Sequence, residues 1–338
     1  MSDILNKLTK QITENQILPA DQMTAGFDEM MEGKASPVQM AAFLIALKMR
    51  GEAPSDIAAG AGSLRRHALT LDAPDNAMDI VGTGGDGIGT YNISTATALV
   101  LAGAGIPIAK HGNKAVSSKS GAADVLTALG INLDCSEEAL SEALTAAKIV
   151  FLMAPRHHSA MRHVGPIRAE LGVRTIFNLL GPLSNPALVR RILVGVFDAR
   201  WLQPFAEALR TLGTTDAFIV HGADGLDELS TTGSNQITML KDGQISETTL
   251  HPSDLSLPTA SLSDIKGGSA EENATALREL LSGKEGPYRN IVLMNAAAAF
   301  VAGGHEKEMA VGLERARQSI DTKAAQSALD QLIFITNK

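Results

Sequence analysis

The chain has 338 residues, a mass of 35.4 kDa and a hydrophobic content of 45%, which suits about two globular domains and argues against disorder. A net charge of −8 and an aromatic content of 4% argue against a general nucleic-acid binder, which needs a basic face or stacking platforms. The single cysteine, Cys135, precludes an intrachain disulfide and fits a reducing compartment. The start lacks the pattern of a secretory signal, and no apolar run reaches the ~20 residues of a membrane span. We therefore expect a soluble cytoplasmic protein that binds neither nucleic acid nor membranes.

Residues 1–72 predict helices alone. Ser36 followed by Pro37 is typical of a helix start, because serine caps the first turn and proline suits the first helical position. A broad apolar face follows, and Gly51 ends it. A second helix start lies at Pro54. We expect a small all-helical domain here.

Residues 73–338 alternate short apolar runs with helical patterns. This alternation predicts a mostly parallel sheet covered by helices, and hence an α/β fold class. The segment 243–262 is rich in Ser, Thr, Pro and Asp and predicts irregular or edge structure. The expected strands are 79–81, 106–109, 149–152, 191–197 and 217–220, and the expected helices are 94–104, 137–147, 202–212, 270–281 and 290–302.

A glycine-rich segment from Gly82 to Thr90 joins the first expected strand to a helix. Its five glycines let the backbone approach a ligand closely, and the N–H groups of the segment and of the helix start suit phosphate. The segment also contains the GxGxxG pattern of dinucleotide sites. However, such a site needs an acidic residue at the end of the next strand, where this chain has Lys110 and His111. An NADP-binding module, with Lys110 at a 2′-phosphate, stays open as an alternative.

Two further segments carry charge at strand ends. Residues 110–121 hold three lysines and three serines, which indicates an anion site in this acidic protein, although a solvated loop would have the same composition. The adjacent carboxylates of Asp227 and Glu228 suit Mg²⁺, which binds one or two carboxylates together with substrate phosphates. Taken alone, this pair is more simply a surface acidic turn.

A third segment combines the histidine pair His157 and His158 with Arg168, which follows Gly165 and Pro166. A lone histidine pair is more often structural than ligating. The guanidinium of Arg168 could bind a carboxylate in bidentate fashion or pair with Glu170 at the surface.

In this order along nearly the whole chain, these motifs resemble the anthranilate phosphoribosyltransferases of tryptophan biosynthesis. The matching stretches are residues 82–86, 92–95, 110–121, 157–168, 178–182 and 227–229. The resemblance implies a small helical domain over 1–72, joined by helices near 165–185, and a larger α/β domain over 73–338 with the nucleoside phosphorylase and phosphoribosyltransferase architecture. It also implies a homodimer.

The family transfers phosphoribose from 5-phosphoribosyl pyrophosphate (PRPP) to the amine of anthranilate and releases pyrophosphate. By motif match, two Mg²⁺ per subunit would be bound by Ser94, Asp227 and Glu228. Anthranilate would contact Gly82, Asn113 and Arg168, with His111, His158 and Pro182 along its path. PRPP would be bound by Gly82, Gly85, Asp86, Thr90, Asn92, Ile93, Ser94, Thr95, Lys110, His111, Gly112, Asn113, Lys114, Ala115, Val116, Ser117, Ser118 and Ala122.

The chain departs from the family pattern at two positions. Family members commonly have serine at the position of Ala122 and arginine at that of Lys114. One neutral hydrogen bond is worth ~1 kcal/mol, so we expect an adjusted PRPP affinity and an unchanged reaction.

The nearest rival function is a pyrimidine nucleoside phosphorylase, which would use a nucleoside and inorganic phosphate and would lack the Asp-Glu pair.

Overall fold

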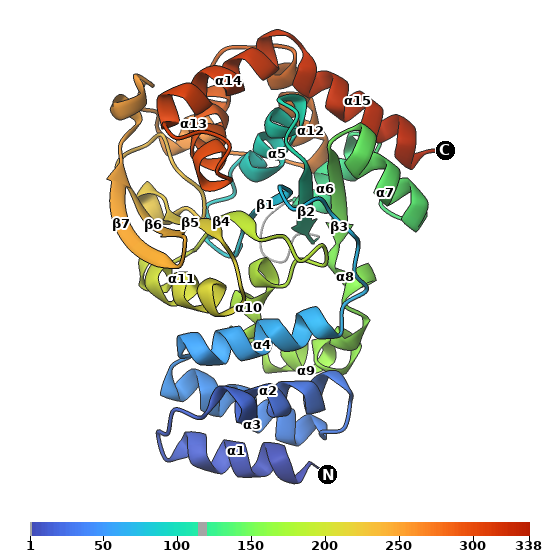
Figure 1. The fold of residues 1–338 in the computed structure, drawn as a ribbon, viewed down its shortest axis with the longest axis vertical. Helices are drawn as coiled ribbons and strands as arrows, with labels where there is room; N and C mark the ends of the chain where they lie inside the picture. The colour runs from blue at the N-terminus through green and yellow to red at the C-terminus, as the bar shows by residue number, and fades with distance from the viewer. Residues whose placement is uncertain (1, 114–119) are drawn as a thin grey trace.

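The computed structural model describes residues 2–113 and 120–338, and its long axis runs from a helical part to a larger α/β part (Figure 1). The helical part begins with α1 (Asp3–Thr13), α2 (Ala20–Met31), α3 (Pro37–Arg50) and α4 (Pro54–Arg66). Two segments from the middle of the chain pack on it, since α9 (Gly165–Leu171) contacts α3 and α10 (Phe177–Leu180) contacts α4.

The expected start and end of α3 are confirmed. The Ser36 hydroxyl accepts from the N–H of Gln39, and the Gln39 side chain accepts from the N–H of Ser36, which satisfies two backbone donors of the first turn. Gly51 ends the helix with φ of +93°, a conformation that glycine adopts without a steric penalty.

The α/β part is built on one seven-stranded sheet with the order β3-β2-β1-β4-β5-β6-β7. The first five strands are parallel, and β6 and β7 join antiparallel at one edge. The mostly parallel sheet predicted from the sequence is therefore confirmed. The strands are β1 (Met78–Gly82), β2 (Ile108–Gly112), β3 (Ile149–Met153), β4 (Arg191–Gly195), β5 (Asp216–His221), β6 (Asn235–Lys241) and β7 (Gln244–Leu250).

Helices cover both faces of the sheet. Ile80 and Leu193 face a core shared with α5, α12, α13, α14 and α15, whereas Val81 and Ile192 face a core that continues through α11 into the helical part. The second core therefore includes residues of both parts, and α11 lies between the sheet and the helical part in Figure 1. The remaining α-helices are α5 (Ile93–Gly103), α6 (Ala122–Ala128), α7 (Glu137–Ala146), α8 (Ala154–His157), α11 (Leu202–Thr211), α12 (Ala270–Leu281), α13 (Pro287–Ala302), α14 (Met309–Asp321) and α15 (Ala324–Thr336).

Several boundaries differ from the sequence prediction. The second strand starts two residues and ends three residues later than the expected 106–109, because the N–H of Ile106 still closes the turn after α5 by donating to the Leu101 carbonyl at 3.1 Å. The fourth strand ends at Gly195 rather than at 197. The segment 243–262, predicted to be irregular or edge structure, begins with β7, which is an edge strand of the sheet. The strand β6 had not been predicted, because its mixed sequence NQITMLK alternates weakly.

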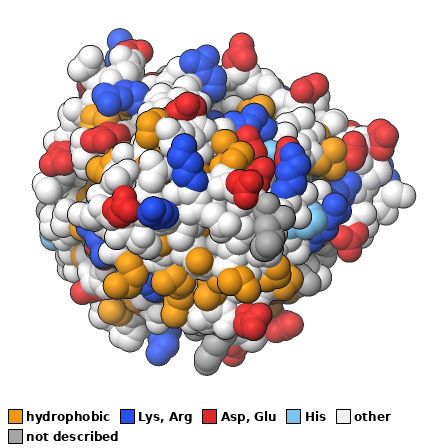
Figure 2. Space-filling model, turned by 90° about the horizontal axis from the view of Figure 1, so that it is seen from below, with side chains coloured by type: hydrophobic (Ala, Val, Ile, Leu, Met, Phe, Trp, Pro, Cys, Tyr) orange, Lys and Arg blue, Asp and Glu red, His pale blue; other side chains and the backbone are white. Residues whose placement is uncertain are grey.

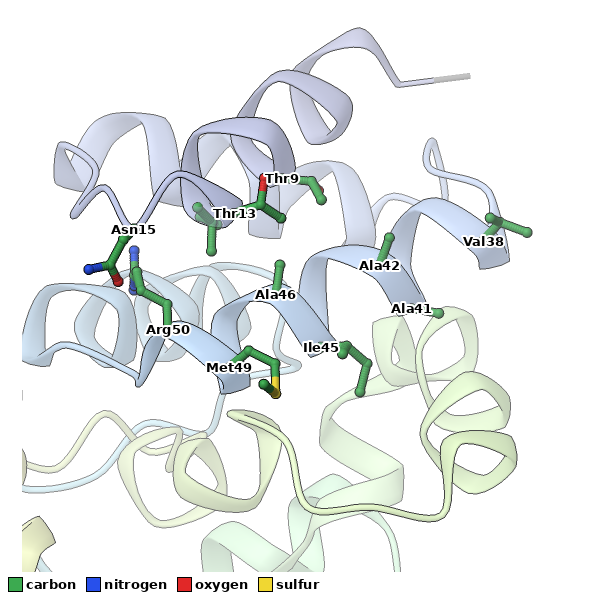
Figure 3. A pocket seen from close by; sticks show the side chains of 11 residues that line it. Thr9, Thr13, Asn15, Val38, Ala41, Ala42, Ile45, Ala46, Met49 and Arg50 are labelled. Carbon is green, nitrogen blue, oxygen red and sulfur yellow. The ribbon is translucent and has the colours of Figure 1, made fainter.

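The outer side of α3 is apolar as well as its inner side. Its inner residues Phe43, Leu44 and Leu47 are fully buried, while Val38 and Met49 on the outer side are each 79% exposed. With α1 this side forms a groove of about 790 Å³, shown in Figure 3, at the end of the molecule where Figure 2 shows a band of apolar side chains. Within the described residues, no helix is long and apolar enough to span a membrane.

Candidate active site

A cleft of about 920 Å³ lies at the carboxyl ends of β1 and β2, between the sheet and the helical part. Open parallel sheets bind ligands at this position because the loops that follow the strands meet there. The α/β part contributes residues 81–94, 110–113, 120–122, 197, 227–228 and 266–268. The opposite wall comes from Gly165, Arg168, Ala169, Gly172, Val173, Arg174 and Asn178.

Two glycines make room for the acidic loop. Gly82 and Gly195 are register partners at the ends of β1 and β4. A Cβ atom on Gly82 would lie 2.2 Å from Oδ2 of Asp227, and one on Gly195 would lie 1.6 Å from the Asp227 carbonyl oxygen. Leu226 and Leu229 anchor the loop on either side, since both are fully buried. The position of the Asp227 and Glu228 backbone is therefore fixed by close packing.

The glycine-rich segment folds over the same carboxylate. The N–H of Gly84 donates to Asp227 Oδ2 at 2.6 Å, and the N–H of Ile88 donates to Asp86 Oδ1 at 3.1 Å. Gly84 and Gly85 both have positive φ, +68° and +79°, which other residues rarely adopt. Arg174 crosses from the helical part and donates to the Gly85 carbonyl at 2.5 Å, with its guanidinium 4.4 Å from the Phe197 ring centre.

The start of α5 points into the same region. Its first turn is tied to the acidic pair, because the N–H of Ser94 donates to Glu228 Oε1 at 3.1 Å. The Thr95 hydroxyl is buried there and finds no hydrogen-bond partner among residues 2–113 and 120–338. A helix N-terminus favours anions because its first N–H groups are unpaired and the helix dipole is positive at that end.

Burial and charge repulsion raise the pKa values of the acidic pair, Asp227 and Glu228. Burial, and then the charge of Glu228, raise the pKa of Asp227 well above its usual range, and burial raises the pKa of Glu228 to about 7. Lys110 acts against the shift at Glu228, and its own pKa is lowered by burial. A further positive charge beside the pair would relieve the repulsion.

Lys110 and His111 lie near the carboxyl end of β2, and both line the cleft. The ammonium of Lys110 is buried and donates to the Ile80 carbonyl at 2.5 Å. The buried carboxylate of Asp79 accepts from the N–H of His111 at 3.2 Å. Because the Gly181 carbonyl can only accept, the Nδ1 of His111 donates to it at 3.1 Å. Burial lowers the pKa of His111 to about 3, which keeps this ring neutral.

Arg168 lies on α9 across the cleft from the glycine-rich segment. Its guanidinium is 5.4 Å from the Phe177 ring centre, and burial lowers its pKa without removing its charge at neutral pH. The cleft therefore has the cation Arg168 on one wall and the acidic pair on the opposite wall.

Most of the predicted site residues lie on the cleft wall. Ala122 and Asn113 line it, as do the predicted residues of the glycine-rich segment. His158, Pro182 and Thr95 lie behind the wall, with the His158 ring 5.1 Å from that of His111. The predicted positions Lys114, Ala115, Val116, Ser117 and Ser118 fall outside the described residues.

Sequence reasoning missed part of the wall. Arg174, Asn178 and Phe197 were not recognised as site residues, nor was the segment Lys266–Gly268. The segment reaches the site because residue 266 bridges to Thr90 and the N–H of Gly267 donates to the Gly89 carbonyl at 2.9 Å. The pair Gly267-Gly268 was the available signal, since adjacent glycines indicate a close backbone approach.

The acidic pair fits Mg²⁺ by its chemistry. Asp227 is buried and Glu228 half-buried. Both are oxygen donors whose repulsion a divalent cation would relieve, and Mg²⁺ prefers one or two carboxylates with waters and phosphate oxygens. Among the described side chains, no group of three or more His, Cys, Asp or Glu residues could hold a metal alone.

Sequence comparison identifies the class first. Residues 2–68 match the helical bundle domain of a glycosyl transferase family, and residues 74–326 match the a/b domain of that family. The chain thus has both domains of a glycosyl transferase of this family.

Individual relatives narrow the class. An anthranilate phosphoribosyltransferase of Parvibaculum lavamentivorans is 52% identical over 97% of this chain and 96% of its own. The crystal structure of the Thermus thermophilus enzyme superposes with a TM-score of 0.93 at 41% identity, covering 98% of this chain and 99% of that one. The chain belongs to the anthranilate phosphoribosyltransferase family.

Two structures from Saccharomyces cerevisiae contain ligands. An anthranilate phosphoribosyltransferase in complex with PRPP and Mg has a TM-score of 0.91 and 30% identity, covering 100% of this chain and 99% of that one. A complex with 4-fluoroanthranilate has a TM-score of 0.88 and 28% identity, covering 98% of each chain.

Proposed function

We propose that this protein transfers the phosphoribosyl group of PRPP to the amine of anthranilate, giving N-(5-phosphoribosyl)anthranilate and pyrophosphate in tryptophan biosynthesis. The observation that carries the proposal is the convergence of three features on one cleft. These are the glycine-rich segment, the α5 N-terminus and the acidic pair Asp227–Glu228. The ligands of the yeast structures support the same assignment.

In this reaction the bond between ribose C1 and the pyrophosphate oxygen breaks, a bond from C1 to the anthranilate nitrogen forms, and the nitrogen releases one proton. Negative charge grows on the leaving group, so the residues need to stabilise an anion and align an amine. The glycine-rich segment 82–90 and the start of α5, with the side chains of Asn92 and Ser94, bind the phosphates. No nucleophilic side chain is required.

Ser94, Asp227 and Glu228 bind magnesium, which we propose at two ions per subunit. When bound, Mg²⁺ supplies positive charge to the pyrophosphate. Asp227 is held ready for this by the N–H of Gly84 and by packing against Gly82 and Gly195, so it needs no rearrangement. The Asp-Glu pair also favours this function over a phosphorylase.

The anthranilate carboxylate binds Arg168, whose planar guanidinium matches it in bidentate geometry. Gly82 and Asn113 contact the ring from the sheet side, and His111, His158 and Pro182 lie along its path. The neutral state of His111 suits this role, because a charged imidazolium would compete with Arg168 for the carboxylate.

We also propose a homodimer formed by the outer side of α3, which Figure 3 shows as a row of apolar side chains. A helix that is apolar all round is normally buried, and α3 is covered on its inner side alone. A second copy supplies an identical apolar surface, and most soluble oligomers use such self-complementary contacts. Substituting Val38 and Met49 by glutamate should give monomers by light scattering.

The proposed domain boundary lies between residues 72 and 73, with the helices near 165–185 added to the small domain. We propose a cytoplasmic location, where the single buried thiol of Cys135 stays reduced.

Calorimetric titration with PRPP tests the assignment of the cleft. Binding should require Mg²⁺ and should weaken when Asp227 and Glu228 are changed to Asn and Gln, whereas NADP should not bind. Binding of NADP with no response to PRPP would replace the proposal by the dinucleotide alternative.

A further inference from the structure

We infer that Asn273 on α12 is a positioning residue that turns the Asn92 amide so that its Nδ2 group faces the phosphate-binding region. The inference rests on the proposed use of PRPP and goes beyond it. Asn273 is 2% exposed and comes from a part of the chain that carries none of the predicted site residues.

The orientation of the Asn273 amide follows from one backbone donor. The N–H of Gly268 lies 2.8 Å from its oxygen, and an N–H can only donate, so Oδ1 of Asn273 occupies that side. Its Nδ2 group therefore faces the other way. There it donates to Asn92 Oδ1 at 3.0 Å and to the Ser120 hydroxyl at 2.9 Å.

The same logic fixes Asn92. The atom that meets the Nδ2 donor of Asn273 has to be an acceptor, so Oδ1 of Asn92 is held there and its own Nδ2 is on the opposite side. Asn92 lines the cleft, and no hydrogen bond from its Nδ2 is found among residues 2–113 and 120–338. The result is an oriented pair of N–H donors at the cleft, which suits a phosphate oxygen.

The Asn92 side chain also lacks the hydrogen bond that is usual at its position in a helix. It is the N-cap residue of α5, where an asparagine oxygen normally accepts from the second or third N–H of the helix. Within the described chain its side chain makes no such capping bond, and its oxygen accepts from Asn273 instead. Tyr288 holds the backbone of Asn92 from the other side, donating to its carbonyl at 3.2 Å.

The test is the Asn273→Asp variant, which keeps the size and the acceptor for Gly268 but has no donor. Asn92 then has to rotate and donate to the new carboxylate, which turns its Oδ1 toward the phosphates. We expect the Kd for PRPP with Mg²⁺ to rise about ten- to a hundredfold, as for a lost hydrogen bond to a charged group. The KM for anthranilate should stay within about twofold. Thr275→Ala, which removes an exposed hydroxyl on the same helix, is the matched control.

A double-mutant cycle separates orientation from general damage. In an Asn92→Ala background, Asn273→Asp should change PRPP affinity less than twofold, because no amide is left to orient. If Asn273→Asp does not fold, Asn273→Ala replaces it in the cycle. It too should weaken PRPP binding when Asn92 is present and change it less than twofold in the Asn92→Ala background. Equal effects in both backgrounds, or wild-type affinity in the single variants, would overturn the inference. A wild-type protein that does not bind PRPP would instead overturn the proposed function.

Discussion

The Gly195→Ala substitution is the most severe test of how the acidic loop is held. The added Cβ would lie 1.6 Å from the Asp227 carbonyl oxygen, and contacts below 3.0 Å are essentially never observed, so the atoms have to separate by about 1.4 Å. The neighbouring atom belongs to the backbone, and Leu226 and Leu229 anchor the loop on both sides. The displacement therefore falls on Asp227 and Glu228. A misplacement of ~1 Å can cost ~100-fold in rate, so we expect kcat to fall at least that far.

The assay is steady-state turnover of PRPP and anthranilate at saturating Mg²⁺, with circular dichroism to confirm the fold. Gly62→Ala is the matched control, because its Cβ would meet neighbours at 3.5 and 3.7 Å, which are ordinary contacts. This control should keep wild-type turnover. A folded Gly195→Ala protein with a kcat within threefold of wild type would refute the argument that these glycines position the acidic pair.

Three further predictions concern the cleft. Because burial raises the pKa of Glu228 to about 7, the folded protein binds more protons than the unfolded chain, so without Mg²⁺ its unfolding free energy should fall as pH rises from about 4.5 to 7. Glu228→Gln should make the unfolding free energy, measured by denaturant titration, depend less on pH. An unchanged pH dependence would show that Glu228 is not its cause. Arg168→Ala should raise the KM for anthranilate roughly ten- to a hundredfold and leave that for PRPP nearly unchanged, since one charged hydrogen bond is worth ~1.5–3 kcal/mol; an unaltered anthranilate KM would remove this residue from the site. Ala122→Ser should tighten PRPP binding by no more than the ~1 kcal/mol of one neutral hydrogen bond, and a change of two decades in KM would show that its role is misplaced.

The sequence predicted the fold class and most strands because their signals are local. The apolar run before Gly82 and the serine cap at Ser36 need no knowledge of distant partners. The strand β6 was missed, because its pairing with β5 and β7, and not its own pattern, makes it a strand.

Site residues divide in the same way. The glycine-rich segment and the acidic pair are visible as motifs, so their place on the cleft could be expected. Arg174 and Asn273 could not be predicted, because each comes from a segment distant in sequence. Arg174 reaches the site by its hydrogen bond to the Gly85 carbonyl, and Asn273 by its hydrogen bond to the Asn92 side chain. The reason for Gly195 likewise becomes clear only when Asp227 is seen packed against it.

The central claim is tested most directly by following the fluorescence of anthranilate with the purified wild-type protein. The account predicts that the fluorescence falls when PRPP and Mg²⁺ are both present, with release of one pyrophosphate for each anthranilate consumed. It also predicts no loss when Mg²⁺ is removed by a chelator. A protein that leaves anthranilate unchanged under these conditions but cleaves uridine with inorganic phosphate would contradict the account and establish the phosphorylase in its place.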